Sequence, residues 1–194
     1  LHRKEPLVLF FNLYPDFPHA NTRNMDFLLK GLAEVSEKLK THHIPTIFME
    51  GDALVNLQKL HDQLDISLLI TEHNPLRPIK TVHQNVGDWA ASQSIRFIRV
   101  NTACVIPVWD ASPKLEFSAK TLRNKLMSRY EGYLAPSVPV IDHPYTALVD
   151  SVFTSRDAQN ALSDRSWPTL SLSELIPGEE AANRVLEDFI RHKL

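Results

Sequence analysis

The sequence is poor in glycine and cysteine, and these two shortages exclude several classes of protein. It has five glycines in 194 residues, and none are spaced as in the G-x-G-x-x-G dinucleotide loop or the P-loop of nucleotide-binding proteins. The G-x-S-x-G motif of α/β hydrolases is absent as well. A single cysteine, Cys104, excludes an internal disulfide framework and a thiolate zinc cluster.

Charge of one sign and long apolar runs are also scarce. A formal net charge of −2 gives the chain as a whole no electrostatic footprint for nucleic acid. No window approaches the roughly 18 apolar residues of a membrane span, and the first residues do not resemble a signal peptide. The nine histidines include no H-x-x-x-H pair. We expect no membrane or metal partner, and a soluble intracellular protein of the nucleus or the cytoplasm.

What the sequence does have is an alternation of short apolar runs and longer helical patterns. We expect strands at residues 7–13, 45–49, 66–71 and 95–100, and a short fifth strand at 104–108. Helical spacing of apolar residues fills the intervals, from Met25 to Leu39, after Gly51-Asp52, and from Ile79 to Ala90. This alternation is typical of an α/β fold with a Rossmann-like or flavodoxin-like three-layer parallel sheet.

The character of the sequence changes after Pro113. Residues 117–133 are predicted to form one amphipathic helix with an exposed row of cations, either a nucleic-acid-facing stripe or an ordinary solvated face: Lys120, Arg123, Lys125 and Arg129. Scattered prolines then indicate an extended linker, and a final helix begins near Pro177. We therefore divide the chain into an α/β domain (1–112), a linker (113–176) and the first helix of a further domain (177–194).

Polar residues follow three of the predicted strands at their carboxyl ends, where open α/β sheets bind ligands. The candidates for a small-molecule crevice are Asn12, Glu72, Asn74, Arg77 and Asn101. The alternative is a set of ordinary turns, with Asn74 beginning a helix and Arg77 in a surface ion pair. No candidate catalytic residue and no metal ligand emerges from the sequence.

Four blocks resemble class II cyclobutane-pyrimidine-dimer photolyases, in the same order along the chain. Residues 70–77 (I-T-E-H-N-P-L-R) resemble the family's T-D-x-x-P-L-R loop. Residues 105–123 (V-I-P-V-W-D-A-S-P-K-L-E-F-S-A-K-T-L-R) resemble its I-V-P-x-W-x-A-S-x-K-x-E-Y-S-A-R-T-I-R segment. Residues 24–32 resemble a helix start of the family, and residues 177–189 the first helix of its flavin-binding domain. The blocks at residues 70–77 and 105–123 are specific to the family, and the other two would be weak evidence alone.

The resemblance implies that the chain is the antenna-domain fragment of a light-driven DNA-repair lyase. Such proteins use reduced FAD to split pyrimidine dimers in UV-damaged DNA, and the FAD and lesion sites would lie in a helical domain beyond this chain. The fragment would be inactive alone. A deazaflavin or folate antenna pigment is the possible cofactor of the α/β domain.

Two departures from the family pattern bear on these expectations. Asn101-Thr102-Ala103-Cys104 stands where the family usually has Asp-Ala-His-Asn, which puts antenna binding in doubt. The family's first strand, central in its 3-2-1-4-5 sheet, would precede Leu1, so we expect these residues alone to be poorly stable. The alternative function is a photolyase-derived, non-enzymatic light-sensing or interaction module. A flavodoxin-like electron-transfer protein is disfavoured by the missing glycine loops.

Overall fold

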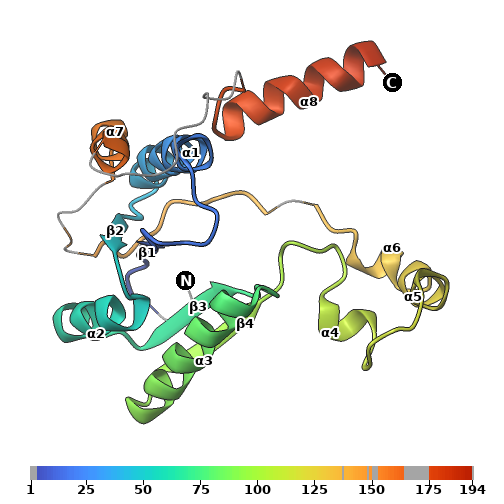
Figure 1. Ribbon diagram of the computed structural model, residues 1–194, viewed down its shortest axis with the longest axis horizontal. Coiled ribbons are helices and arrows are strands. Elements are labelled where there is room, and N and C mark those ends of the chain that lie inside the picture. The colour runs from blue at the N-terminus through green and yellow to red at the C-terminus, as the bar shows by residue number, and fades with distance from the viewer. Residues whose placement is uncertain (1–3, 137, 148, 150–152, 164–174, 194) are drawn as a thin grey trace. The chain divides into compact units, whose positions relative to one another are not determined.

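The computed structural model describes residues 4–136, 138–147, 149, 153–163 and 175–193 (Figure 1). The chain divides into two units, one of residues 1–52 and 140–194 and one of residues 53–139. In the described residues no helix is both long and apolar enough to cross a bilayer.

Unit 1 combines the start of the chain with its end. Its elements are β1 (Leu9–Leu13), α1 (Thr22–Thr41), β2 (Thr46–Glu50), α7 (Ser155–Ser163) and α8 (Glu179–Lys193). Asn21 begins α1 as its N-cap, since the Asn21 side chain accepts a hydrogen bond from the Asn24 amide at 3.0 Å. The strands β1 and β2 run parallel, with Phe11 opposite Phe48.

The core of unit 1 joins segments that are far apart in the sequence. Met25, Leu29 and Ala33 line one side of α1 and are buried with Leu13 and with residues beyond 150, which are Phe153, Ala158 and Ala161. The ring of Phe153 stacks on Phe48 with a centroid distance of 4.3 Å. Ala158 and Ala161 of α7 are buried in this core, so α7 is a structural part of this unit.

Helix α7 lies inside the segment predicted to be an extended linker, and that prediction was wrong at this point. Thr154 and Asp157 form a capping box: the Thr154 amide donates to the Asp157 carboxylate at 2.8 Å, and the Asp157 amide donates to the Thr154 hydroxyl at 3.3 Å. The cap starts the helix, and its two buried alanines allow it to lie close to α1. Residues 164–174 of the predicted linker lie outside the described residues.

Unit 2 holds the middle of the chain. Its elements are α2 (Ala53–Leu64), β3 (Leu68–Glu72), α3 (Arg77–Ser92), β4 (Arg96–Val100), α4 (Val108–Ala111), α5 (Ala119–Met127) and α6 (Tyr130–Tyr133). Helix α3 packs closely on β4, because a Cβ on Gly87 would lie 3.2 Å from the Phe97 ring. His61 of α2 meets Trp89 of α3 edge to face, at 5.8 Å between centroids.

The predicted α/β class with parallel strands is confirmed, and the four longer strands lie within two residues or so of their expected places. They form two parallel two-stranded sheets, β1 with β2 and β3 with β4. In the part of the chain that the structure describes, no ladder joins β1 to β3. In the family's 3-2-1-4-5 sheet the first strand would precede Leu1, so β1 to β4 correspond to the family's second to fifth strands. The pairs β1–β2 and β3–β4 then match the neighbours 2–3 and 4–5 of that sheet.

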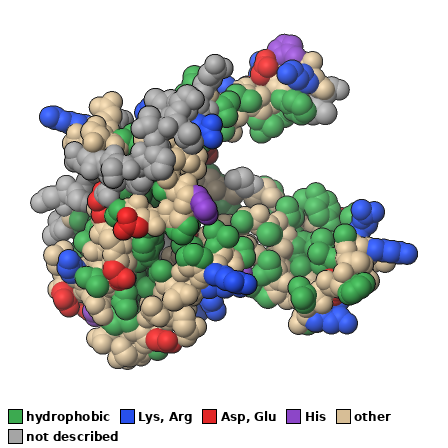
Figure 2. All heavy atoms as spheres, in the orientation of Figure 1, with side chains coloured by type: hydrophobic (Ala, Val, Ile, Leu, Met, Phe, Trp, Pro, Cys, Tyr) green, Lys and Arg blue, Asp and Glu red, His purple; other side chains and the backbone are tan. Residues whose placement is uncertain are grey.

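Two expectations for the residues after β4 were wrong. The fifth strand does not form: Pro107, which lacks an amide hydrogen, is the N-cap of α4, and the Val108 amide bonds to Asn101 instead of to a strand. The single helix expected over 117–133 is broken into α5 and α6. The Ser128 hydroxyl turns back onto the Lys125 carbonyl at 3.0 Å, where the first helix ends. Large hydrophobic side chains remain exposed on α8 and over α4 to α6 (Figure 2).

Candidate functional site

The carboxyl ends of β3 and β4 place two of the candidate residues side by side. In the parallel register Glu72 lies opposite Val100, so Asn101 is the next residue along the neighbouring strand. The His73 amide donates to the Val100 carbonyl at 2.5 Å, which extends the ladder past the end of β3. The loops that follow both strands therefore begin at one point of unit 2.

The Glu72 carboxylate holds the loop after β4 through several hydrogen bonds. Its Oε2 accepts from the Thr102 hydroxyl at 2.5 Å, and its Oε1 accepts from the Thr102 amide at 2.9 Å, the Asn101 Nδ2 at 3.2 Å and the Ala103 amide at 3.3 Å. These bonds, led by that from the Thr102 hydroxyl, lower the pKa of Glu72 to about 2. Both carboxylate oxygens are thus occupied by the protein itself.

Asn101 connects this carboxylate to the next helix. Its side chain is buried, and while Nδ2 donates to Glu72, Oδ1 accepts from the Val108 amide at 3.0 Å. That amide is the first of α4, so Asn101 satisfies a backbone donor at a helix start. We call Glu72, Asn101 and Thr102 the loop clamp, because together they fix residues 101–108 against the ends of the strands.

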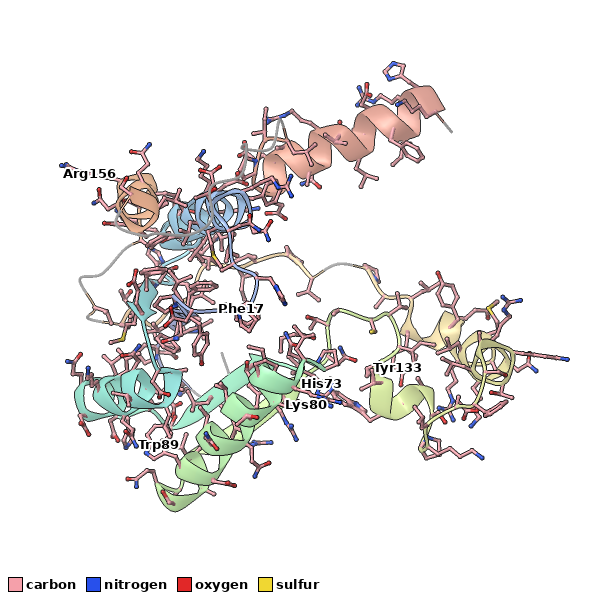
Figure 3. All side chains as sticks on the ribbon, in the orientation of Figure 1. Phe17, His73, Lys80, Trp89, Tyr133 and Arg156 are labelled. Atoms are coloured by element: carbon pink, nitrogen blue, oxygen red, sulfur yellow. The ribbon has the colours of Figure 1, made fainter. Side chains whose placement is uncertain are left out.

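Two aromatic side chains lie close to the loop clamp in the sequence, His73 directly after β3 and Trp109 in α4. His73 and Trp109 meet edge to face, with centroids 5.6 Å apart. Figure 3 labels His73 just beyond β3 and Lys80 on the first turns of α3. Cys104 is an exposed thiol in the same loop region, not the buried strand residue that a fifth strand would require. The sequence did not single out the His73–Trp109 pair, since nothing in its pattern brings two residues so far apart in the chain together.

The remaining candidates have local roles. The Asn74 Oδ1 accepts from the Leu76 amide at 3.0 Å, an Asx turn that leads into α3. Arg77 is the first residue of α3 and is exposed. Asn12 belongs to unit 1, where its Nδ2 donates to the Gly51 carbonyl at 2.8 Å and ties the end of β1 to the end of β2. The structure thus brings Glu72 and Asn101 into direct contact, with Asn74 in the neighbouring turn.

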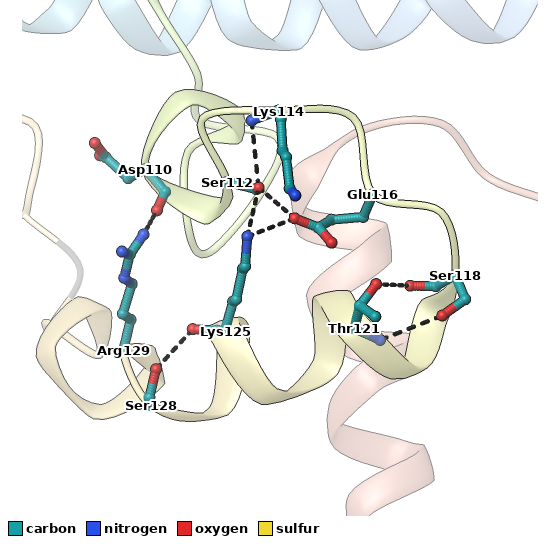
Figure 4. A network of polar contacts seen from close by, with 9 residues as sticks. All are labelled: Asp110, Ser112, Lys114, Glu116, Ser118, Thr121, Lys125, Ser128 and Arg129. Carbon is teal, nitrogen blue, oxygen red and sulfur yellow. Dashed lines mark hydrogen bonds and ion pairs between the residues drawn. The ribbon is translucent and has the colours of Figure 1, made fainter.

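A second polar network lies between α4 and α5 (Figure 4). The Glu116 carboxylate accepts from Lys125 Nζ at 2.5 Å and from the Ser112 hydroxyl at 2.6 Å, and Lys125 also donates to Ser112 at 3.1 Å. These bonds, that from Lys125 first, lower the pKa of Glu116 to about 2. We call Ser112, Glu116 and Lys125 the loop network.

The loop network changes the interpretation of the basic stripe expected on this helix. Lys125 is half-buried in its ion pair with Glu116, and the Arg129 guanidinium donates to the Asp110 carbonyl. The expectation of four exposed cations is therefore corrected for Lys125, whereas Arg129 is exposed although it bonds within the unit. Lys120 and Arg123 are exposed as predicted.

No three His, Cys, Asp or Glu side chains of the described residues converge as a metal site would require. Comparison with known proteins supplies what the geometry leaves open. Residues 1–141 match the family model described as DNA photolyase. The chain belongs to the DNA photolyase family.

Two photolyases are similar to the chain over nearly all of its length. The deoxyribodipyrimidine photo-lyase of Arabidopsis thaliana is 30% identical over 185 residues, covering 93% of this chain and 37% of the relative. That of Potorous tridactylus is 32% identical over 199 residues, covering 100% of this chain and 36% of the relative. The chain therefore spans little more than a third of the length of these photolyases.

Solved photolyase structures share the fold. The archaeal photolyase from Sulfolobus tokodaii, solved with two FAD molecules, superposes with a TM-score of 0.69 at 13% identity, over 98% of this chain and 42% of that one. A bacterial class III photolyase from Agrobacterium tumefaciens gives a TM-score of 0.64 at 14% identity, over 96% of this chain and 39% of that one. At such identities these likenesses concern the fold alone.

Proposed function

We propose that the chain is the N-terminal part of a class II deoxyribodipyrimidine photolyase, a lyase that repairs cyclobutane pyrimidine dimers in UV-damaged DNA under light. The observation that carries this proposal is the similarity to two photo-lyases along 93% and 100% of the chain. The class II assignment rests on the motifs of residues 70–77 and 105–123. A non-enzymatic module derived from the family is not favoured, since the relatives compared are photo-lyases.

The proposal assigns different tasks to this chain and to a following domain. A helical domain after Leu194 would hold reduced FAD, and this flavin, once excited by blue light, would supply the electron that splits the dimer. Residues 1–112 form the α/β antenna part, to which α7 contributes its two buried alanines, the rest of residues 113–176 connects, and α8 begins the flavin-binding domain. None of the residues singled out in this chain is assigned a catalytic role.

The loop clamp bears on whether a deazaflavin or folate antenna pigment binds here. Glu72 and Asn101 already use their oxygens and the Asn101 amide on the protein, so they fit poorly as ligands of a pigment. Arg77 is exposed and the His73–Trp109 pair lies beyond the strands, so these groups are the ones that unit 2 could offer to a pigment. We assign the loop clamp a structural role, which is to hold the loop after β4.

The direct test uses the full-length gene product. The purified protein is reduced and mixed with DNA that carries cyclobutane thymine dimers, and the dimers that remain are counted by chromatography after blue light and after darkness. We expect loss of dimers only under light, with a bound flavin seen by absorbance. A full-length protein that binds and reduces flavin but leaves the dimers intact under light would contradict the proposed function.

A further inference from the structure

The loop between α4 and α5 has its apolar side chains outside and its charge inside. Leu115 is 99% exposed and Phe117 is 100% exposed, whereas the Glu116 side chain between them is only 10% exposed. A loop on a free surface has the opposite arrangement, because water solvates a carboxylate and is ordered by large apolar groups. This inversion indicates that something covers the outer side of the loop.

The exposure of Leu115 and Phe117 is imposed by a well-bonded loop. The loop network anchors Glu116 beneath them through Lys125 and Ser112 (Figure 4). At its end Ser118 caps α5: the Ser118 hydroxyl accepts from the Thr121 amide at 3.4 Å, and the Ser118 carbonyl accepts from the Thr121 hydroxyl at 2.9 Å. Because both ends of the loop are bonded, the two apolar side chains are held outward.

The surroundings of the loop have the composition of an interface. Hydrophobic side chains gather over α4 to α6, with lysines and arginines at the edge (Figure 2). Trp109, Met127 and Tyr130 are exposed in this region, and the exposed cations near the loop are Lys114, Lys120 and Arg123. An apolar centre with aromatic residues and a charged rim is the usual anatomy of a protein–protein contact.

We propose that residues 112–123 are a docking surface for the chain's own helical domain, the one that the proposed function places after Leu194. The inference rests on that proposed function. The photo-lyases that match this chain along nearly its whole length are far longer, since the chain covers 37% and 36% of them. Their additional length is enough for a large domain, and it is the occupant most available to this surface.

The side chains of this surface indicate what the contacting face of the helical domain has to offer. Leu115 and Phe117 fit two apolar pockets, and the three cations around them fit an acidic rim. DNA is a poorer occupant, because Lys125 and Arg129 are already bound within the unit and the loop presents two hydrocarbon side chains toward the partner. The following domain would be held to the antenna part by residues 112–123 as well as by the covalent connection.

The first test measures solvent access to the loop in the full-length protein. Hydroxyl-radical footprinting with peptide mass spectrometry compares the modification of Leu115 and Phe117 in the native protein and in urea. We expect both to be modified several-fold more slowly in the native protein. Equal rates in both conditions would overturn the proposal. Protection that is lost on dilution would identify a second copy as the occupant, and protection only with added DNA would identify DNA; both overturn it.

The second test uses a pair of charged substitutions in the full-length protein. Phe117→Glu replaces a fully exposed ring, which none of the described residues covers, by a carboxylate, so without a covering domain the substitution is neutral or favourable. We expect it to lower Tm and to speed protease cleavage of the connecting segment. The control Gln58→Glu adds the same charge at an exposed position of α2, outside residues 112–123, and is expected to have a much smaller effect. Equal effects of the two would overturn the proposal.

Dimer repair by the same preparations separates the two proposals. Light-dependent repair by a protein whose Phe117 is fully accessible refutes the docking surface and leaves the function intact. Protection of Phe117 in a protein that does not repair dimers under light refutes the function and leaves the docking surface intact.

Discussion

At the scale of single residues, two carboxylates of unit 2 hold loops in place. Glu72 closes the loop after β4, and Glu116 closes the loop before α5. Each carboxylate accepts hydrogen bonds from groups across a turn, and each has its pKa lowered to about 2. Both residues belong to the two specific motifs, so these motifs encode loop geometry.

The lowered pKa of Glu116 predicts a dependence of stability on pH. The unfolded carboxyl group titrates near its ordinary value of 4.5, and the folded one near 2. The stabilising effect is therefore complete above about pH 4.5 and is lost as the pH falls through about 2. Replacing Glu116 by Gln is expected to reduce the slope of Tm with pH between these two pH values.

Thermal unfolding followed by circular dichroism at several pH values measures this effect. Glu131→Gln, an exposed carboxylate on α6, is the matched control and is expected to keep the parent slope. A Glu116→Gln protein with the same acid slope as the parent would show that the loop network does not contribute to stability.

At the scale of secondary-structure elements, α8 is attached to α1 through its first turn. The Glu34 carboxylate of α1 accepts from the Glu180 amide at 3.1 Å, and Lys38 pairs with Glu179 at 2.6 Å. Gly178 precedes the helix with φ of +104°, and a Cβ there would overlap the Glu34 carboxylate. Glycine is thus required for both the backbone conformation and the close approach.

Gly178→Ala is expected to weaken this attachment. The alanine is strained at positive φ, at a cost of about 1–3 kcal/mol, and its methyl group displaces Glu34 from the Glu180 amide. Hydrogen exchange of the α8 amides should accelerate. Gly132→Ala is the control, because a Cβ at Gly132 meets nothing within 4 Å. Unchanged exchange in Gly178→Ala would mean that α8 does not depend on this contact.

The success of sequence reasoning differed between elements for physical reasons. The strands follow from short apolar runs, and α1 to α3 from apolar residues at helical spacing, because burial in a core imposes these patterns on each element. Helix α7 is short and polar, and its Thr154-x-x-Asp157 capping box is the sequence signal that could have predicted it. Glu72 and Asn101 could be proposed from their positions after strands. Their mutual contact could not, because it depends on the register that sets Glu72 opposite Val100.

At the scale of the whole molecule, the separation of the strands into two pairs predicts weak cooperativity. Each sheet has two strands, and two-stranded sheets are marginally stable without further support. The 194-residue chain alone is expected to unfold over a broad temperature range, with a van't Hoff enthalpy well below the calorimetric enthalpy. Scanning calorimetry makes the comparison. Equal enthalpies in a single sharp transition would contradict the expectation of poor stability.

The core of unit 1 has a consequence for the order of events during synthesis. Phe48 stacks on Phe153, and all of unit 2 lies between them in the chain. At the ribosome's rate of about 5–20 residues per second, β2 emerges roughly 5–20 seconds before its aromatic partner. Unit 2 is one continuous stretch of the chain, residues 53–139, and can fold during that interval. Unit 1 is therefore the first unit to be synthesised and the last to be completed. The apolar face of β2 stays uncovered until the segment that contains Phe153 has been made.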